Sequence, residues 1–188
     1  QMWTAQSLGT GGARRVLFSG GMGSMGFALP AAIGALLGGA KAAYVIAGDG
    51  GIQMNIQELE VVRRRRLSLK IIVMNNACLG MVRQFQEQYF GGRCLGTVTD
   101  YSCPDLVKVS AAYGIASARV PVGKADKKLF ARLCKPGAFF LDLTLDKDSA
   151  VEPKLGLNMP IEDMHPRLPR DEFLKTMIVP PAEESLRE

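Results

Sequence analysis

Two polar side chains, Asp49 and Asn76, each follow a short apolar run and have the chemistry to bind one metal ion together. A carboxylate and an amide oxygen are hard donors suited to Mg²⁺, which completes its coordination with phosphate oxygens and water. Gly50 and Gly51 leave bare backbone N–H groups beside Asp49, a suitable place for phosphate. Alone, Asp49-Gly50 is more typical of a turn and Asn75-Asn76 of a helix cap. Together they predict a site for a Mg²⁺-bridged diphosphate.

The apolar runs at 42–47 and 69–74 would position these side chains. Both runs are short, rich in β-branched residues and nearly uncharged, which is typical of strands buried on both faces of a parallel sheet. Between them, residues 55–66 predict a helix whose apolar residues share one side: Ile56, Leu59 and Val62. Such a strand–helix–strand unit has a right-handed crossover, and it places both polar side chains at the carboxyl ends of parallel strands, where open α/β sheets bind ligands.

The rest of the chain continues the alternation of strands and helices. Further predicted elements are helices at 1–8, 27–37, 79–89 and 125–134, a helix from Pro104 with Ser102 or Cys103 near its cap, strands at 16–18, 115–120 and 138–145, and a loop at 91–99. This order predicts the α/β class, with a doubly wound, mostly parallel sheet and helices on both faces. We expect a domain at 1–147 and a proline-rich tail at 148–188 that packs on the domain or on a partner subunit.

The composition is that of an ordinary globular protein, with 47% apolar and 22% charged residues. No apolar run is long enough to span a membrane. The four cysteines form no C-x-x-C pair, which favours reduced thiols in the cytoplasm, or in an organelle of a eukaryote. Part of the net charge of +5 lies in four arginines at 63–66. Without interleaved aromatic residues, this run is typical of a helix end and not of a nucleic-acid surface.

A dinucleotide-binding loop is the main alternative interpretation. Residues 21–26 fit the pattern G-x-G-x-x-G ahead of a predicted helix. That pattern requires an acidic residue about 20 residues further on to bind the ribose. No Asp or Glu precedes Asp49, so a nucleotide-binding oxidoreductase is disfavoured.

Gly-Asp-Gly followed at this distance by Asn-Asn resembles the signature of thiamine-diphosphate-dependent enzymes. The segments 20–26, 54–59 and 79–84 resemble the C-terminal cofactor-binding domain of acetolactate synthases, and the likeness runs from Gln1 to about Leu145. The resemblance implies an enzyme that uses thiamine diphosphate and Mg²⁺. It also implies that Gln1 lies inside a longer chain of three domains; an FAD site, if the enzyme has one, would lie in another of these domains.

The resemblance assigns roles to individual residues. Asp49, Asn76 and the backbone carbonyl of Cys78 would bind the metal ion. The carbonyl of Gly23 would accept a hydrogen bond from the aminopyrimidine, and Met25 would wedge between the two rings and hold the cofactor bent. Other cofactor-binding positions would be Gly21, Gly50, Gly51, Gly80 and Met81.

Two positions of the predicted helix at 79–89 bear on the substrate. In pyruvate-decarboxylase-like relatives a glutamate that handles protons stands at the position of Val82. Val82 cannot transfer a proton, which favours carboligation of a 2-oxo acid such as pyruvate with a second carbonyl. In many acetolactate synthases a tryptophan that helps to select the second 2-oxo acid stands at the position of Phe85. Phe85 departs from that pattern, so the resemblance does not identify the acceptor substrate. Both side chains could instead be helix-face core.

The resemblance also implies that this chain holds half of an active site. A glutamate from the pyrimidine-binding domain of a partner subunit would activate the cofactor, so we expect a homo-oligomer and no turnover by the isolated 188-residue chain. The open alternatives are a decarboxylase or carboligase of sugar or secondary metabolism with another acceptor, and a catalytically silent homologue.

Overall fold

The computed structural model describes residues 1–9 and 15–186. The chain divides into two compact units, Gln1–Ser149 and Ala150–Glu188, and each is described by itself.

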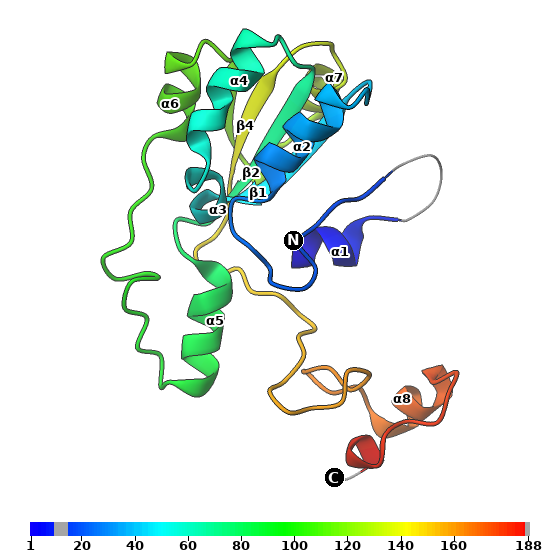
Figure 1. The fold of residues 1–188 in the computed structure, drawn as a ribbon. Helices are drawn as coiled ribbons and strands as arrows, with labels where there is room; N and C mark the ends of the chain where they lie inside the picture. The colour runs from blue at the N-terminus through cyan, green and yellow to red at the C-terminus, as the bar shows by residue number, and fades with distance from the viewer. Residues whose placement is uncertain (10–14, 187–188) are drawn as a thin grey trace. The chain divides into compact units, whose positions relative to one another are not determined.

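A four-stranded sheet forms the centre of the larger unit (Figure 1). Its strands are β1 (Ala43–Gly48), β2 (Leu69–Asn75), β3 (Ser117–Pro121) and β4 (Phe139–Thr144), in the spatial order β1-β2-β4-β3. All three pairings are parallel, and Gly48 at the end of β1 lies beside Met74 near the end of β2. The central strands β2 and β4 are largely buried, which is why their sequences are nearly continuous apolar runs.

Helices cover both faces of this sheet. On one face, α2 (Ala28–Leu37), α4 (Leu59–Arg64) and α6 (Leu106–Ala112) share a core with the strands. On the other, α7 (Lys127–Leu133) packs Leu129 and Leu133 against β4. The sheet is therefore a parallel α/β sheet with helices on both faces, and the predicted fold class is confirmed.

The predicted helix at 55–66 is wrong in its first half. The chain forms α3 (Asp49–Gln53), then a 3₁₀ turn η1 (Ile56–Glu58), and only then α4. Asn55 interrupts the helix because its φ of −135° is not helical, and its side-chain amide donates to the Gly26 carbonyl at 3.0 Å. Leu59 and Val62 are fully buried on one side, as predicted.

The predicted strand at 16–18 is also wrong. These residues pair with no other strand, and their side chains are 47–60% exposed. β1 is an edge strand, and no described segment joins its outer edge. Tyr44 and Ile46 of β1 are 55% and 36% exposed, so the prediction that this strand is buried on both faces is wrong. A run of strand-forming residues becomes a strand only where a neighbour completes the hydrogen-bond ladder.

The other predicted elements of the larger unit are present, with shifted ends. They include α1 (Met2–Ser7), α5 (Gly80–Tyr89) and the irregular segment at 91–99, and a 3₁₀ turn η2 (Val122–Lys124) follows β3. The N-cap of α6 is Asp105, and not Ser102 or Cys103. Its carboxylate accepts hydrogen bonds from the N–H groups of Val107 and Lys108 at 3.2 and 3.3 Å.

The smaller unit contains α8 (Arg170–Thr176) and a 3₁₀ turn, η3 (Glu183–Leu186). An ion pair lies at its centre: buried Asp163 accepts two hydrogen bonds from the Arg170 guanidinium, at 2.9 and 3.0 Å. Arg170 also lies 4.7 Å over the ring of buried Phe173. This segment thus has internal order of its own, and its packing on the domain or a partner subunit stays a prediction.

Candidate functional site

The predicted metal-binding side chains meet at the edge of the sheet where β1 and β2 end. Asp49 is the first residue of α3, directly after β1, and Asn76 directly follows β2. Their parallel pairing brings these two strand ends together. Both side chains are buried, with exposed fractions of 1% and 7%. Burial of two polar groups at one strand edge is typical of a functional site rather than of a surface turn.

Three oxygen-bearing groups converge at this point. One terminal atom of the Asn76 amide lies 3.2 Å from Asp49 Oδ1 and 2.9 Å from the Cys78 carbonyl oxygen. When the amide nitrogen faces them, Asn76 donates a hydrogen bond to each oxygen. When the amide oxygen faces them, three acceptors meet, an arrangement that a cation stabilises. Neighbouring oxygens in an octahedron around Mg²⁺ are about 3.0 Å apart, since the metal–oxygen distance is about 2.1 Å. The donor set therefore fits this ion.

Cys78 can contribute its carbonyl oxygen but not a thiolate. Its thiol is buried, and this burial raises the pKa of Cys78, so the sulfur stays protonated at neutral pH. Across residues 1–9 and 15–186, no three His, Cys, Asp or Glu side chains are grouped so that they could hold a metal. An ion bound here would rely on one carboxylate plus amide and carbonyl oxygens, which suits Mg²⁺ and not zinc.

Tyr101 is a further constituent of the site. Its hydroxyl donates a hydrogen bond of 2.8 Å to Asp49 Oδ2, which leaves Oδ1 facing Asn76. Burial raises the pKa of Asp49, and the Tyr101 hydrogen bond opposes that rise. Burial, followed by the bond to Asp49, raises the pKa of Tyr101, so this hydroxyl remains a donor at neutral pH.

The absence of side chains at Gly50 and Gly80 allows this close packing. A side-chain carbon on residue 50 would lie 2.4 Å from Leu79 Cδ2 and 3.2 Å from Met25 Cε. One on residue 80 would lie 2.6 Å from the Asn76 amide. Met25 therefore reaches Gly50 from the loop at 20–26, and its side chain is still 48% exposed. That exposure argues against a plain core role for this methionine.

Adding a methyl group at residue 80 is expected to disturb the site. In Gly80→Ala the new carbon would overlap the Asn76 amide and push it away from Asp49 and Cys78. We expect a loss of about 1–3 kcal/mol in the free energy of unfolding and weaker binding of Mg²⁺. Gly34→Ala in α2 is the matched control, because nothing lies within 4 Å of the added carbon there. Unchanged Mg²⁺ affinity in Gly80→Ala, by calorimetry, would contradict this packing.

A buried polar network positions the turn that carries Asn76. Asp142 of β4 is fully buried and accepts hydrogen bonds from Asn75 at 2.9 Å and from Arg119 Nε at 2.8 Å. Asn75 in turn accepts a hydrogen bond from the N–H of Ala77, whose φ is +52°. Arg119 also contacts Asp105 at 2.8 Å. The network links the end of β2 to β3, β4 and the start of α6, and it fixes the backbone on both sides of Asn76.

The other predicted site residues have open space around them or exposed side chains. Around Gly21, Gly23 and Gly51 no atom lies within 4 Å of the place a side-chain carbon would take, and Gly23 has a φ of +60°. Met81, Val82 and Phe85 lie on α5, which begins next to Asn76, and they are 42%, 46% and 37% exposed. They are therefore not helix-face core. Their proposed contacts with cofactor and substrate stay predictions.

Three residues of the site that the motifs do not include, Tyr101, Arg119 and Asp142, differ in how far their local sequence indicates a buried polar role. Asp142 is the one charged residue inside the apolar run Phe139–Thr144, a pattern that marks a buried and paired carboxylate. Arg119 likewise interrupts an apolar strand. Tyr101 has no local signal, because its partner Asp49 lies 52 positions earlier in the chain.

A parallel sheet with a buried carboxylate and amide at adjoining strand ends defines a cofactor-binding domain of the α/β class. Residues 1–143 match the family model described as thiamine pyrophosphate enzyme, C-terminal TPP binding domain. The chain therefore belongs to the thiamine pyrophosphate enzyme family, and residues 1–143 correspond to its C-terminal cofactor-binding domain.

Similar proteins agree with this assignment. The chain is 40% identical over 158 residues to the acetolactate synthase large subunit of Buchnera aphidicola subsp. Schizaphis graminum, covering 81% of this chain and 28% of that protein. It is 37% identical over 156 residues to acetolactate synthase isozyme 2 large subunit of Escherichia coli, covering 81% and 28%. The structure of a Rhodococcus jostii thiamine diphosphate-dependent 4-hydroxybenzoylformate decarboxylase matches with a TM-score of 0.57 and 26% identity, over 68% of this chain and 24% of that one. The chain thus spans about a quarter of the length of these relatives.

Proposed function

We propose that this chain supplies the diphosphate- and Mg²⁺-binding half of an active site for carboligation of 2-oxo acids, as in acetolactate synthases. The reaction would be decarboxylation of pyruvate and transfer of the activated aldehyde to a second carbonyl. The observation that carries the proposal is the convergence of Asp49, the Asn76 amide and the Cys78 carbonyl at the strand edge. The similarity of the chain to acetolactate synthases supports 2-oxo acids as the class of substrate.

Asp49, Asn76 and the Cys78 carbonyl would hold Mg²⁺ on the diphosphate. The N–H groups of Gly50 and Gly51 would donate to its oxygens, and Gly21, Gly80 and Met81 would complete the wall around the cofactor. Met25 and the Gly23 carbonyl would hold the two rings in the bent shape that brings the reacting atoms together. Thiamine diphosphate, when bound, supplies a carbanion-stabilising ylid.

The exposed face of α5 would set the outcome of the reaction. Val82 has no group that can transfer a proton, so it would not promote release of a free aldehyde. Phe85 packs against Tyr89, with ring centroids 4.7 Å apart, and would shape the space for the second 2-oxo acid. Together these side chains favour carbon–carbon bond formation.

The active site would need a second polypeptide segment. We propose that a glutamate from the pyrimidine-binding domain of a partner subunit activates the cofactor, within a homo-oligomer. We also propose a cytoplasmic or organellar location. The four cysteines are free thiols, which suits a reducing compartment. The relatives include bacterial and chloroplastic enzymes. No helix in the described parts of the chain is long and apolar enough to cross a membrane.

A second candidate is a thiamine-diphosphate-dependent decarboxylase with another 2-oxo acid as substrate. The match to the structure of a decarboxylase of 4-hydroxybenzoylformate favours it. The two candidates share the cofactor site and differ in whether the aldehyde leaves or joins a second carbonyl.

Calorimetry of the full natural polypeptide tests the cofactor, and product analysis tests the reaction. Thiamine diphosphate is expected to bind at one Mg²⁺-dependent site per chain, and NADH is expected to show no Mg²⁺-dependent binding. Mg²⁺-dependent binding of NADH, or binding of thiamine diphosphate that is the same with Mg²⁺ and with excess chelator, would contradict the proposal. With pyruvate, mass spectrometry is expected to detect acetolactate; a free aldehyde as the sole product would favour the decarboxylase.

A further inference from the structure

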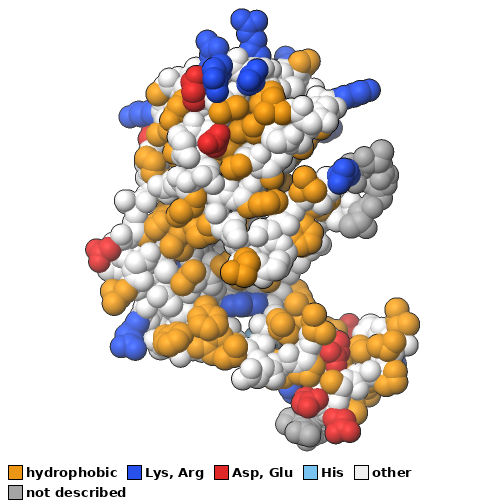
Figure 2. Space-filling view, viewed as in Figure 1, with side chains coloured by type: hydrophobic (Ala, Val, Ile, Leu, Met, Phe, Trp, Pro, Cys, Tyr) orange, Lys and Arg blue, Asp and Glu red, His pale blue; other side chains and the backbone are white. Residues whose placement is uncertain are grey.

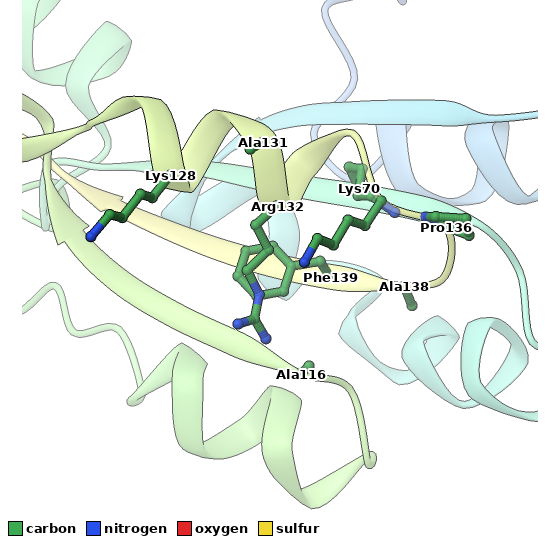
Figure 3. A pocket seen from close by; sticks show the side chains of 9 residues that line it. Lys70, Ala116, Lys128, Ala131, Arg132, Pro136, Ala138 and Phe139 are labelled. Carbon is green, nitrogen blue, oxygen red and sulfur yellow. The ribbon is translucent and has the colours of Figure 1, made fainter.

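A cavity lies at the amino-terminal ends of the strands, where β2 and β4 begin. Its volume is about 640 Å³, within the usual range for small-molecule sites. Figure 3 shows Lys70 and Phe139 on the sheet side, with Ala131 and Arg132 of α7 over them, while the Lys128 side chain extends away from Lys70. Small apolar residues, including Pro136 and Ala138, form the remaining wall. Because β2 ends at Asn75, this cavity is separated from the Asp49 site by the length of the strand.

The lining is strongly cationic. Lys70, Lys128, Arg132 and Lys135 all line the cavity, and no acidic residue does. Within the described residues none of these four forms an ion pair with a carboxylate. Figure 2 shows Lys and Arg side chains gathered at the top of the same unit, with Asp and Glu side chains near them.

Lys70 is the most unusual of these cations. It stands in the central strand β2 and is only 4% exposed, and burial lowers its pKa. Its ammonium group donates to the Gly137 carbonyl. An ammonium has three donors, so this bond leaves capacity for a ligand. A buried cation without a carboxylate partner is costly, and an anion in the cavity would compensate it.

The nearby end of α7 does not account for this charge. A helix C-terminus carries roughly half an elementary negative charge, and cations in the last turn complement it. Four cations around α7 exceed that charge several-fold. Arg132 is already held in place by the Phe139 ring, with its guanidinium carbon 4.4 Å from the ring centroid. A guanidinium fixed in this way can present its N–H groups to an anion without further ordering.

We propose that this cavity binds a small organic anion that carries a phosphate or diphosphate group. Lys70 and Arg132 contact the phosphate oxygens, Lys128 and Lys135 contribute longer-range attraction, and the alanine and proline wall contacts the apolar part of the ligand. The binding does not involve Mg²⁺, because the cavity supplies cations and no carboxylate.

Calorimetry with inorganic pyrophosphate, in the presence of excess EDTA, tests the proposal on the full natural polypeptide. EDTA removes the metal, so the Asp49 site does not take up the diphosphate. We expect one site per chain in wild type and a loss of roughly tenfold or more in affinity for Lys70→Met and for Arg132→Met, since each removes charged hydrogen bonds. Lys124→Met in η2 is the matched control, outside the cavity, and is expected to keep wild-type affinity.

Ribose 5-phosphate and ADP serve as organic probes, and citrate serves as a phosphate-free anion. Tighter binding of either phosphate ester than of citrate supports the proposal, and the better of the two shows whether a sugar phosphate or a nucleotide fits. Equal affinity of wild type and both cavity variants for pyrophosphate would overturn it. So would an equal loss in Lys124→Met, citrate binding as tight as pyrophosphate, or no binding by any probe. Arg132→Met keeps the test decisive if Lys70→Met fails to fold, because Arg132 is exposed.

Discussion

Replacing Asp49 by asparagine in the full natural polypeptide is expected to lower the Mg²⁺-dependent affinity for thiamine diphosphate by more than about 100-fold. Asp49 is the only carboxylate in the converging donor set, so the variant retains only neutral oxygens for the metal. Loss of an outer-shell partner alone already weakens metal binding by about 10–100-fold, and this residue would contact the ion directly.

The same replacement is expected to raise the thermal midpoint of the apoprotein at pH 7. Burial raises the pKa of Asp49 above its ordinary value of 3.8, so the ionised carboxylate costs stability in the folded, metal-free chain. That cost is absent at pH values below the ordinary pKa, where the group is protonated in both states. It grows as pH rises from the ordinary pKa toward the raised one, and it is fully present above the raised pKa. Asparagine never ionises, so the gain is expected at pH 7 and shrinks toward zero in acid.

Calorimetry with thiamine diphosphate and Mg²⁺, and thermal unfolding across the pH range, measure the two effects. Asp171→Asn is the matched control, because Asp171 is an exposed residue in the first turn of α8. Metal-dependent binding retained in Asp49→Asn would contradict the proposed site. A midpoint that does not change with pH relative to wild type would show that burial of this carboxylate is not costly.

The arrangement of β1 and β2 could be predicted because the sequence features that indicate it lie within and directly after each strand. β1 and β2 have the apolar, β-branched composition of buried parallel strands, and Asp49 and Asn76 directly follow them. A parallel pair then brings the two strand ends together without further assumptions. The residues at 16–18 have a similar composition and form no strand, because a strand also needs a partner that composition does not specify.

The contacts that complete the site are not local, and the sequence could not predict them. Tyr101 reaches Asp49, and Asp142 reaches Asn75 across 67 positions of the chain. Each of these residue types has several ordinary roles, and only the packing of β4 against β2 selects one. The N-cap of α6 shows the same limit: Pro104 indicated the helix, but Asp105, with its second bond to Arg119, is the residue that begins it.

The network around Asp142 leads to the second large effect. In Asp142→Ala the Asn75 amide and the Arg119 Nε group each lose a hydrogen-bond partner at a position where Asp142 itself is fully buried. Loss of such a buried partner costs about 2–3 kcal/mol, which is less than the roughly 3–5 kcal/mol of a fully buried ion pair, because Arg119 remains 43% exposed to water. We expect a corresponding fall in the midpoint of chemical unfolding.

Asp142 is also expected to act as a positioning residue for the metal site. It touches none of the converging oxygens, but it holds Asn75, and Asn75 fixes the turn at Ala77 that aims the Asn76 amide and the Cys78 carbonyl. Affinity for Mg²⁺, measured well below the unfolding temperature, is therefore expected to fall about tenfold in Asp142→Ala. Asp142→Asn keeps the shape and an acceptor for Asn75, and it is expected to recover most of that affinity.

Asp105→Ala separates this positioning role from general destabilisation. It removes the cap of α6 and one contact of Arg119, at a cost of about 1 kcal/mol, but leaves the bond between Asp142 and Asn75 in place. Its Mg²⁺ affinity is expected to match wild type. If Asp105→Ala and Asp142→Ala lost the same affinity, the effect would follow stability alone, and the turn at Asn75 would not be what orients the metal-binding oxygens.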